Sequence, residues 1–229
     1  MFGTLYGSGD VVSTSYAVAT IATLALAALA LVGLTWTSSR WRVPLALSAI
    51  ALMAAGFAYL DAGKVWLAQQ QMTAAMRYAG WFTVVPLQVA AAYFFARCLG
   101  PVGVGVFWRI TVAAILLVLT RYLGDAGFFN PTLGVLLSMA FWLYILGEMY
   151  FGSMAEWVRK GTRPVRLGWF WMRLIMTIGW AIYPVLHFVD VVIGVGQAPA
   201  VLVLYNVSDL FNLITVSMIV LAVAGQESY

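Results

Sequence analysis

Seven stretches of this chain are long, apolar and almost free of charge, and they restrict the possible folds more than any other feature of the sequence. A helical run of about 20 apolar residues matches the thickness of the hydrocarbon core of a bilayer. Only helices and closed barrels satisfy their backbone polar groups there. The runs are continuous rather than short and alternating, which favours helices. The sequence predicts spans at residues 15–37, 43–60, 76–96, 107–123, 132–155, 168–190 and 199–224.

The low content of charged residues favours a membrane protein over a soluble one. Of 229 residues, 64% are hydrophobic and 9% are charged, whereas soluble domains carry about 25% charged residues. Seven spans with short connections use the whole chain, so we expect one all-α domain, a seven-helix transmembrane bundle, over residues 1–229. The longest connection, residues 61–75, is amphipathic enough to be expected as a loop on the membrane surface.

Few residues could hold a metal ion or carry out enzymatic catalysis. One Cys, one His and eight carboxylates leave no disulfide framework and little for a metal centre. The sequence offers no evident nucleophile–base pair or cofactor-binding loop, so we expect neither an enzyme nor a metal site. The net charge of +4 does not call for a nucleic-acid partner, because its distribution fits a membrane topology.

Arginine and lysine are concentrated in the connections on one side of the predicted bundle. Such residues are in excess in cytoplasmic loops. The connections after the first, third and fifth spans hold or adjoin Arg40, Arg42, Arg97, Arg109, Arg159, Lys160, Arg163 and Arg166. The opposite side offers only Lys64 and Arg121. We therefore expect an N-terminus outside the cell and a cytoplasmic C-terminus.

The last predicted span contains an acidic residue, Asp209. A carboxylate inside an apolar run of this length is costly unless it faces a protein interior or water, so it marks a candidate functional site. Leu213 lies four residues later, one turn along the same helix face.

Five segments carry a resemblance to a known family. They are the sequences RYAGWFTVVPL at 77–87, YLGDAG at 122–127, WLYILGE at 142–148, WAIYPV at 180–185 and YNVSDLFNL at 205–213. In this order they resemble segments of microbial rhodopsins of the proteorhodopsin and xanthorhodopsin group. The resemblance covers most of the chain and implies the same seven-helix bundle in a bacterial inner membrane. It also implies homo-oligomers, because family members commonly form pentamers or hexamers.

The chemistry of the family's light-driven pumps is missing at several matching positions. The Lys that carries retinal in the family corresponds to Leu213, and the proton-accepting counterion corresponds to Gly80. The Thr beside the counterion corresponds to Val84, and the proton-donor carboxylate to Ala91. The His that pairs with the counterion would lie in the second span, which contains no His. A proton relay needs titratable groups along a path, so we expect no pumping in the family's manner.

A retinal Schiff base needs a lysine amine inside the bundle. The only lysines are Lys64 and Lys160, both in expected loops near the membrane surfaces, so we expect no covalent cofactor. Loss of the Lys together with one counterion leaves Asp209 opposite Arg77 as an expected charge pair, which avoids an uncompensated buried charge. We favour an inherited structural pair over a working one.

The predicted helix faces enclose an elongated, aromatic-walled cavity, a common place for a ligand in a bundle. The residues that correspond to the family's retinal pocket are Trp81, Gln88, Trp180, Tyr183, His187, Asp209 and Leu213. The aromatic residues fit a ligand clamp and an ordinary core equally well. For Gln88 and His187 we favour hydrogen-bonded structural roles, and for Glu148 a pairing with an Arg of the connection between the fifth and sixth spans.

Several functions remain open from the sequence. The first is a non-pumping structural or accessory subunit of a membrane assembly, including a pigment-bearing one. The alternative is a protein that binds a retinoid or carotenoid, a polyene, non-covalently. A light-driven pump or photosensor is a remote third. Small residues in the first two spans permit close packing within one bundle or between protomers, so the expected partners are the lipid bilayer, further copies of this chain or other membrane subunits.

Overall fold

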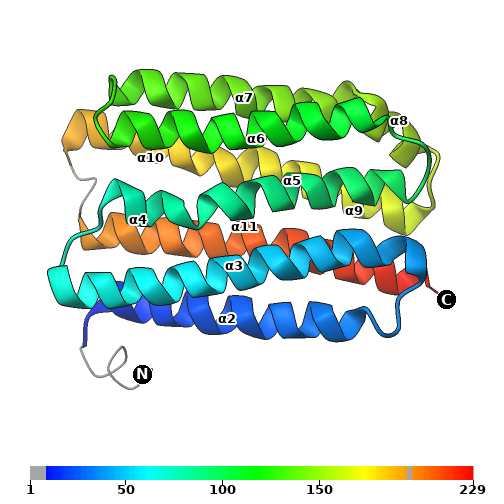
Figure 1. The fold of residues 1–229 in the computed structure, drawn as a ribbon, viewed down its shortest axis with the longest axis horizontal. Helices are drawn as coiled ribbons and strands as arrows, with labels where there is room; N and C mark the ends of the chain where they lie inside the picture. Colours follow the sequence, from blue (N-terminus) through cyan, green and yellow to red (C-terminus); the bar gives the residue numbers. More distant parts are fainter. Residues whose placement is uncertain (1–8, 195–197, 229) are drawn as a thin grey trace.

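The structure, a computed structural model, describes residues 9–194 and 198–228. Within these ranges the chain forms a bundle of seven helical segments that are long and apolar enough to cross a membrane (Figure 1). The helices are α2 (Val11–Gly33), α3 (Ser39–Gln69), α4 (Ala74–Ala79), α5 (Trp81–Arg97), α6 (Val104–Asp125), α7 (Pro131–Phe151), α8 (Ser153–Arg159), α9 (Arg163–Leu174), the π-helix η1 (Ile175–Gly179), α10 (Trp180–Ile193) and α11 (Pro199–Gln226). The third span consists of α4 and α5, the fifth of α7 and α8, and the sixth of α9, η1 and α10.

The second span is longer than predicted. Helix α3 has 31 residues and continues to Gln69, so the expected loop at 61–75 is wrong for residues 61–69. The amphipathic pattern of this segment arises because the last turns of α3 have one exposed and one buried side. Lys64 pairs with Asp61 at 2.9 Å on its exposed side, while the buried Trp66 donates a hydrogen bond to Asp10 at the start of α2. The helix ends where Gln70 adopts a left-handed conformation, with φ of 53°.

Pro44 lies inside α3 rather than before it. Proline has no N–H to bond the carbonyl of the residue four positions earlier, which here is Arg40. The thiol of Cys98, just after α5, lies 2.8 Å from that carbonyl oxygen and can donate to it. The only cysteine of the chain therefore compensates for the proline and links α3 to α5.

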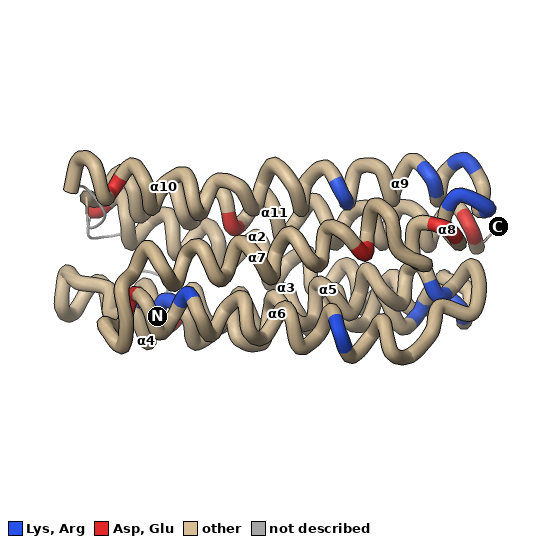
Figure 2. The backbone as a smooth tube through the Cα atoms, turned by 90° about the horizontal axis from the view of Figure 1, so that it is seen from above, with Lys and Arg blue, Asp and Glu red and all other residues tan. Residues whose placement is uncertain are grey.

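The two ends of the bundle differ in charge. Figure 2 shows most of the Lys and Arg residues at the end where the C-terminus lies. By the positive-inside rule this end is cytoplasmic, as the sequence predicted, and the cavity described below lies toward the other end.

The seven spans are not equally buried. About half of the most apolar stretch is buried in the spans formed by α2, α3, α4–α5 and α11, but less than a third in those formed by α6, α7–α8 and α9–α10. The exposed apolar side chains of these last three spans face the position of the lipid, as expected for an integral membrane protein.

Candidate functional site

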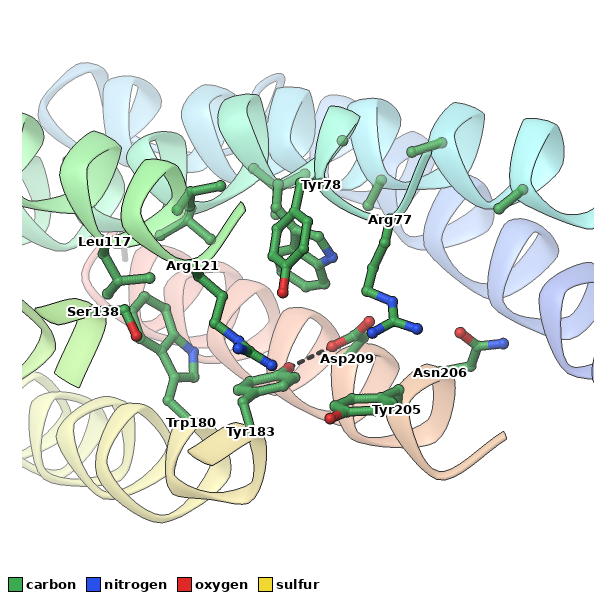
Figure 3. Close-up of a pocket in the computed structure, with 18 of the residues that line it drawn as sticks. Arg77, Tyr78, Leu117, Arg121, Ser138, Trp180, Tyr183, Tyr205, Asn206 and Asp209 are labelled. Atoms are coloured by element: carbon green, nitrogen blue, oxygen red, sulfur yellow. Dashed lines mark hydrogen bonds between the residues drawn. The ribbon is translucent and has the colours of Figure 1, made fainter. Parts of the chain in front are cut away.

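A cavity of about 160 Å³ lies inside the bundle (Figure 3). Each of the seven spans contributes to its wall. The residues that line it include Tyr16, Ala58, Tyr59, Met76, Arg77, Tyr78, Gly80, Trp81, Val84, Val85, Val118, Arg121, Ser138, Trp142, Trp180, Tyr183, Pro184, Leu202, Tyr205, Asn206 and Asp209. At about 10–15 Å³ per water, the space is large enough for several water molecules or for part of a larger apolar ligand.

A hydrogen-bonded chain of polar side chains joins α10 to α11 at the cavity. The buried carboxylate of Asp209 accepts a hydrogen bond from the Tyr183 hydroxyl, drawn as a dashed line in Figure 3. The Asn212 side-chain amide donates to the same hydroxyl at 3.2 Å. Tyr59 also places its hydroxyl near Asp209, without the geometry of a hydrogen bond. These hydrogen bonds hold Asp209, the one acidic residue of the lining, in a single orientation.

Aromatic rings surround this polar group. The Tyr183 ring stacks on Tyr205 with 6.2 Å between centroids and 7° between planes. Trp81 meets Tyr183 edge to face at 6.3 Å, a favourable arrangement of ring quadrupoles. Trp180, the first residue after the π-helix, lines the cavity on the side of Leu117 and Ser138 (Figure 3). Trp81, Trp180 and Tyr183 therefore share the cavity with Asp209, as the sequence predicted.

The predicted charge pair of Arg77 and Asp209 is not a contact ion pair. No N–O distance of 4.0 Å or less joins them among the described residues, and the partner of Asp209 is Tyr183. Arg77 lies on the short helix α4, and its guanidinium sits over the Tyr205 ring, 5.5 Å from the centroid. Tyr205 is one turn before Asp209 on α11, so the arginine points toward the carboxylate and contacts the neighbouring ring without forming an ion pair.

Sequence reasoning missed a second arginine at the cavity. Arg121 lines it from α6 and forms an ion pair with Asp125 at 2.7 Å, its side chain only 14% exposed. The Tyr78 hydroxyl donates to the other oxygen of Asp125 at 2.6 Å. The spacing of four residues between Arg121 and Asp125 was a usable signal, because it places both side chains on one helix face.

Three predicted pocket residues do not line the cavity. Leu213 is fully buried in an apolar cluster that also contains Leu52 and Val84. Gln88 is buried one turn beyond Val84, where the cavity ends, and its amide nitrogen has no hydrogen-bond partner among the described residues. The hydrogen-bonded role expected for Gln88 therefore stays a prediction. The ring of His187 packs toward α7 instead, with Nε2 3.4 Å from the Thr132 hydroxyl.

Gly80, between α4 and α5, allows two helices to approach closely. A Cβ added at this position would lie 2.5 Å from the Cβ of Ala58 on α3. Real Cβ atoms do not approach a rigid neighbour this closely, so no larger residue fits here unless α3 moves. At the position that corresponds to the family's counterion, the space for a side chain is filled by Ala58 of α3.

Glu148 pairs with a different arginine from the one expected. Its carboxylate lies 3.0 Å from Arg109 on α6, rather than near an arginine of the connection between the fifth and sixth spans. Glu148 faces the neighbouring helix of the α6–α7 hairpin, which sequence position alone did not indicate.

Both lysines lie away from the cavity. Lys64 is half exposed beside Asp61, and Lys160 pairs with Glu156 on the cytoplasmic side at 3.1 Å. In the part of the chain that the structure describes, no three His, Cys, Asp or Glu residues come together as metal ligands.

Known proteins resemble this chain in both sequence and fold. The family model described as bacteriorhodopsin-like protein matches residues 11–226. A blue-light absorbing proteorhodopsin from Gamma-proteobacterium Hot 75m4 is 28% identical over 222 residues, covering 96% of this chain and 88% of that protein. The crystal structure of a thermophilic rhodopsin matches with a TM-score of 0.83 at 22% identity, covering 95% of this chain and 93% of the other. Xanthorhodopsin, described as a light-driven ion pump with dual chromophore, gives the same TM-score and coverage at 17% identity.

Proposed function

This chain belongs to the bacteriorhodopsin-like family of microbial rhodopsins, and from that membership we propose that it is a non-pumping member whose cavity binds a polyene, a retinoid or carotenoid, without a covalent bond. The observation that carries the proposal is an aromatic-walled cavity in the bundle that no lysine lines.

Covalent retinal does not fit the residues of this chain. The position that matches the family's lysine holds Leu213, whose fully buried side chain packs in an apolar cluster. Lys64 and Lys160 make ion pairs with residues of their own surface segments. No amine is therefore available to form the bond that holds retinal in the family.

The groups of a proton relay are also missing. Gly80 and Ala91 stand at the positions of the proton acceptor and donor, and Ala91 is fully buried. Asp209 is the only carboxylate among the residues that line the cavity. One carboxylate held by a tyrosine does not make a path across the membrane.

The lining of the cavity suits an apolar ligand with a conjugated chain, and its volume of about 160 Å³ holds part of such a ligand, since whole small-molecule pockets measure roughly 300 Å³ or more. Its wall is mainly aliphatic and aromatic, with few polar groups, the usual make-up of a small-molecule site. Trp81, Trp180 and Tyr183 offer flat faces against which a polyene can pack.

The test is an absorption spectrum of protein purified gently from its own host, followed by solvent extraction of any pigment. We expect a visible band that extracts without hydroxylamine, because no Schiff base has to be cleaved. Colourless protein that also takes up no added retinoid or carotenoid would refute the proposal.

Two substitutions on the same helix sharpen this test. Ser138 lines the cavity from α7, whereas Leu143 on that helix is 56% exposed on the outside of the bundle. Ser138→Phe should fill the cavity and abolish polyene uptake, while Leu143→Phe should leave uptake unchanged. Equal uptake by both variants would place the ligand elsewhere.

A role as a structural or accessory subunit is the second candidate. It is favoured by the combination of an intact bundle, with a TM-score of 0.83 to xanthorhodopsin, and a missing relay. Solubilised protein should then bring other membrane subunits with it during gentle purification. Protein that runs only as a monomer or homo-oligomer would count against this role. The two candidates are compatible, since an accessory subunit could also hold a pigment.

A further inference from the structure

The charges that line the cavity do not match one another. Its lining contains two arginines, Arg77 and Arg121, and one carboxylate, Asp209. Arg121 is neutralised by Asp125 at 2.7 Å, and Asp209 is bound by Tyr183. Arg77 makes no ion pair or hydrogen bond with a described residue, and Asp209, its nearest acidic group in the lining, acts on it only at a longer distance.

Arg77 is a cation with unused hydrogen-bonding capacity. A guanidinium has five N–H donors, yet that of Arg77 donates no hydrogen bond to any described residue and makes no ion pair with one. Its one direct interaction is the contact with the Tyr205 ring. A half-buried guanidinium whose N–H donors are unused is costly, and a bound anion would accept hydrogen bonds from them.

The second arginine faces the same part of the cavity. Figure 3 shows the guanidinium groups of Arg77 and Arg121 directed toward the Tyr183–Asp209 pair from two different spans. Arg121 is already paired with Asp125, so Arg77 is the arginine of this region whose donors are free for a ligand.

Apart from Ser138, Asn206 and the tyrosine hydroxyls, the remainder of the lining is apolar. Beyond Tyr183 the wall passes to Trp180, Trp142 and Val118. An inorganic anion would leave this part unfilled, and a neutral polyene would leave Arg77 without a counterion. A ligand with an anionic head and an apolar tail meets both demands.

We propose that the cavity selects a carboxylate-headed amphiphile, with its head at Arg77 and Arg121 and its tail along Trp142 and Trp180. The planar guanidinium fork matches a carboxylate in a bidentate geometry. This inference rests on the proposed function, because it places the ligand in the same cavity. It adds the chemical class of the head group, shared by a polyene acid and a membrane fatty acid.

The test compares two ligands that differ only in the head group. All-trans-retinoic acid and all-trans-retinol are titrated separately into the purified full chain, and quenching of tryptophan fluorescence reports binding. We expect the acid to bind about tenfold more tightly or better, from the usual worth of a hydrogen bond to a charged group. Equal affinity for acid and alcohol would overturn the inference and leave the proposed function standing, whereas failure of both to bind, together with no uptake of an added carotenoid, would overturn the proposed function.

Substitutions of charged residues then show which side chain causes the tighter binding of the acid. Arg77→Gln should remove the preference for the acid, and Asp209→Asn should increase it, because it removes the one acidic group of the lining. Arg163→Gln, which removes an exposed charge at the cytoplasmic end, is the matched control and should change nothing. A preference that survives Arg77→Gln would overturn the inference.

Two further measurements complete the test. The midpoint of thermal unfolding without ligand should not fall in Arg77→Gln, because the variant loses a costly half-buried charge and only the contact with the Tyr205 ring. If that variant does not fold, Arg77→Lys keeps the charge without the bidentate fork and should weaken the preference. Displacement of retinoic acid by palmitate would identify a fatty acid as a sufficient ligand, whereas a site that palmitate cannot enter requires the polyene tail.

Discussion

Single residues decide what this bundle can no longer do, and Gly80 is the clearest case. Its position matches a charged group in the family, yet here it lets α4 and α5 pack against α3 with no room for a Cβ. The helix packing therefore leaves no space for an acidic side chain at this position unless α3 moves.

Gly80→Ala should destabilise the protein by about 1–3 kcal/mol, the usual penalty of overpacking a core, because the new Cβ meets Ala58. Ala58→Gly in the same chain removes the opposing atom and should restore most of the loss. Ala58→Gly alone, which costs about 0.5–1 kcal/mol for glycine in a helix, is the control. Thermal unfolding in detergent measures all four proteins, and an unchanged midpoint for Gly80→Ala would contradict the close contact.

Asp10 should make the stability of the folded protein depend on pH in the acidic range. It caps α2 through hydrogen bonds from the backbone N–H groups of Val12 and Ser13, at 3.2 Å each. Burial acts to raise the pKa of this carboxyl, but the hydrogen bonds from Trp66, Ser13 and Val12 together lower it below the ordinary value. A lowered pKa stabilises the folded state above the unfolded pKa of about 3.9, and this contribution is lost as the pH falls through the folded pKa.

The midpoint of thermal unfolding should therefore fall as the pH drops below about 4. Asp10→Asn keeps a capping side chain but cannot titrate, so its midpoint should change less over the same range. A pH dependence that is identical in both proteins would show that Asp10 does not contribute.

Among the elements, α3 shows where sequence reasoning succeeds and where it stops. Apolar runs located all seven spans, because their length is set by the bilayer. The end of α3 was missed, since Asp61, Lys64 and the glutamines resemble a loop until Trp66 is seen to pack on the start of α2. The second span was expected to begin at residue 43, next to Pro44, whereas α3 begins at Ser39, and the contact with Cys98 explains why the proline is tolerated inside the helix.

The candidate site shows the same division. The motifs brought Trp81, Trp180, Tyr183 and Asp209 to one cavity, because helix periodicity fixes which residues share a face. They did not exclude Leu213 and Gln88 from the lining, which depends on how neighbouring side chains fill space. The sequence also could not predict that Arg77 contacts Tyr205, because a long side chain can pack on an aromatic ring as well as pair with a carboxylate.

Cys98 should be a structural rather than a reactive thiol. Burial raises its pKa to about 12, so the thiol stays protonated at neutral pH, and thiolates are the reactive form. We expect slow modification by maleimide in the folded protein and fast modification after unfolding. A Cys98→Ala, Ser39→Cys protein, with the thiol at an exposed position of α3, should react quickly when folded. Fast labelling of folded wild-type protein would contradict the link to the Arg40 carbonyl.

At the scale of the whole molecule, charge asymmetry fixes how the bundle sits in the membrane. The basic residues gather at the end that holds the C-terminus (Figure 2). A fluorescent protein fused after Tyr229 should therefore fold and fluoresce in the cytoplasm of a bacterial host, whereas a fused alkaline phosphatase should stay inactive. Active phosphatase at this position would reverse the assigned orientation.

The contact between Gly80 and Ala58 also has a consequence for descent. An ancestral acid at position 80 could be lost in one step, but once α3 had closed over the glycine, the reverse change alone would meet a filled space. Regaining the acid requires a second change on another helix, made beforehand and without benefit of its own. In a chain with this geometry, an acid at position 80 therefore needs two coordinated changes, whereas its absence needs none.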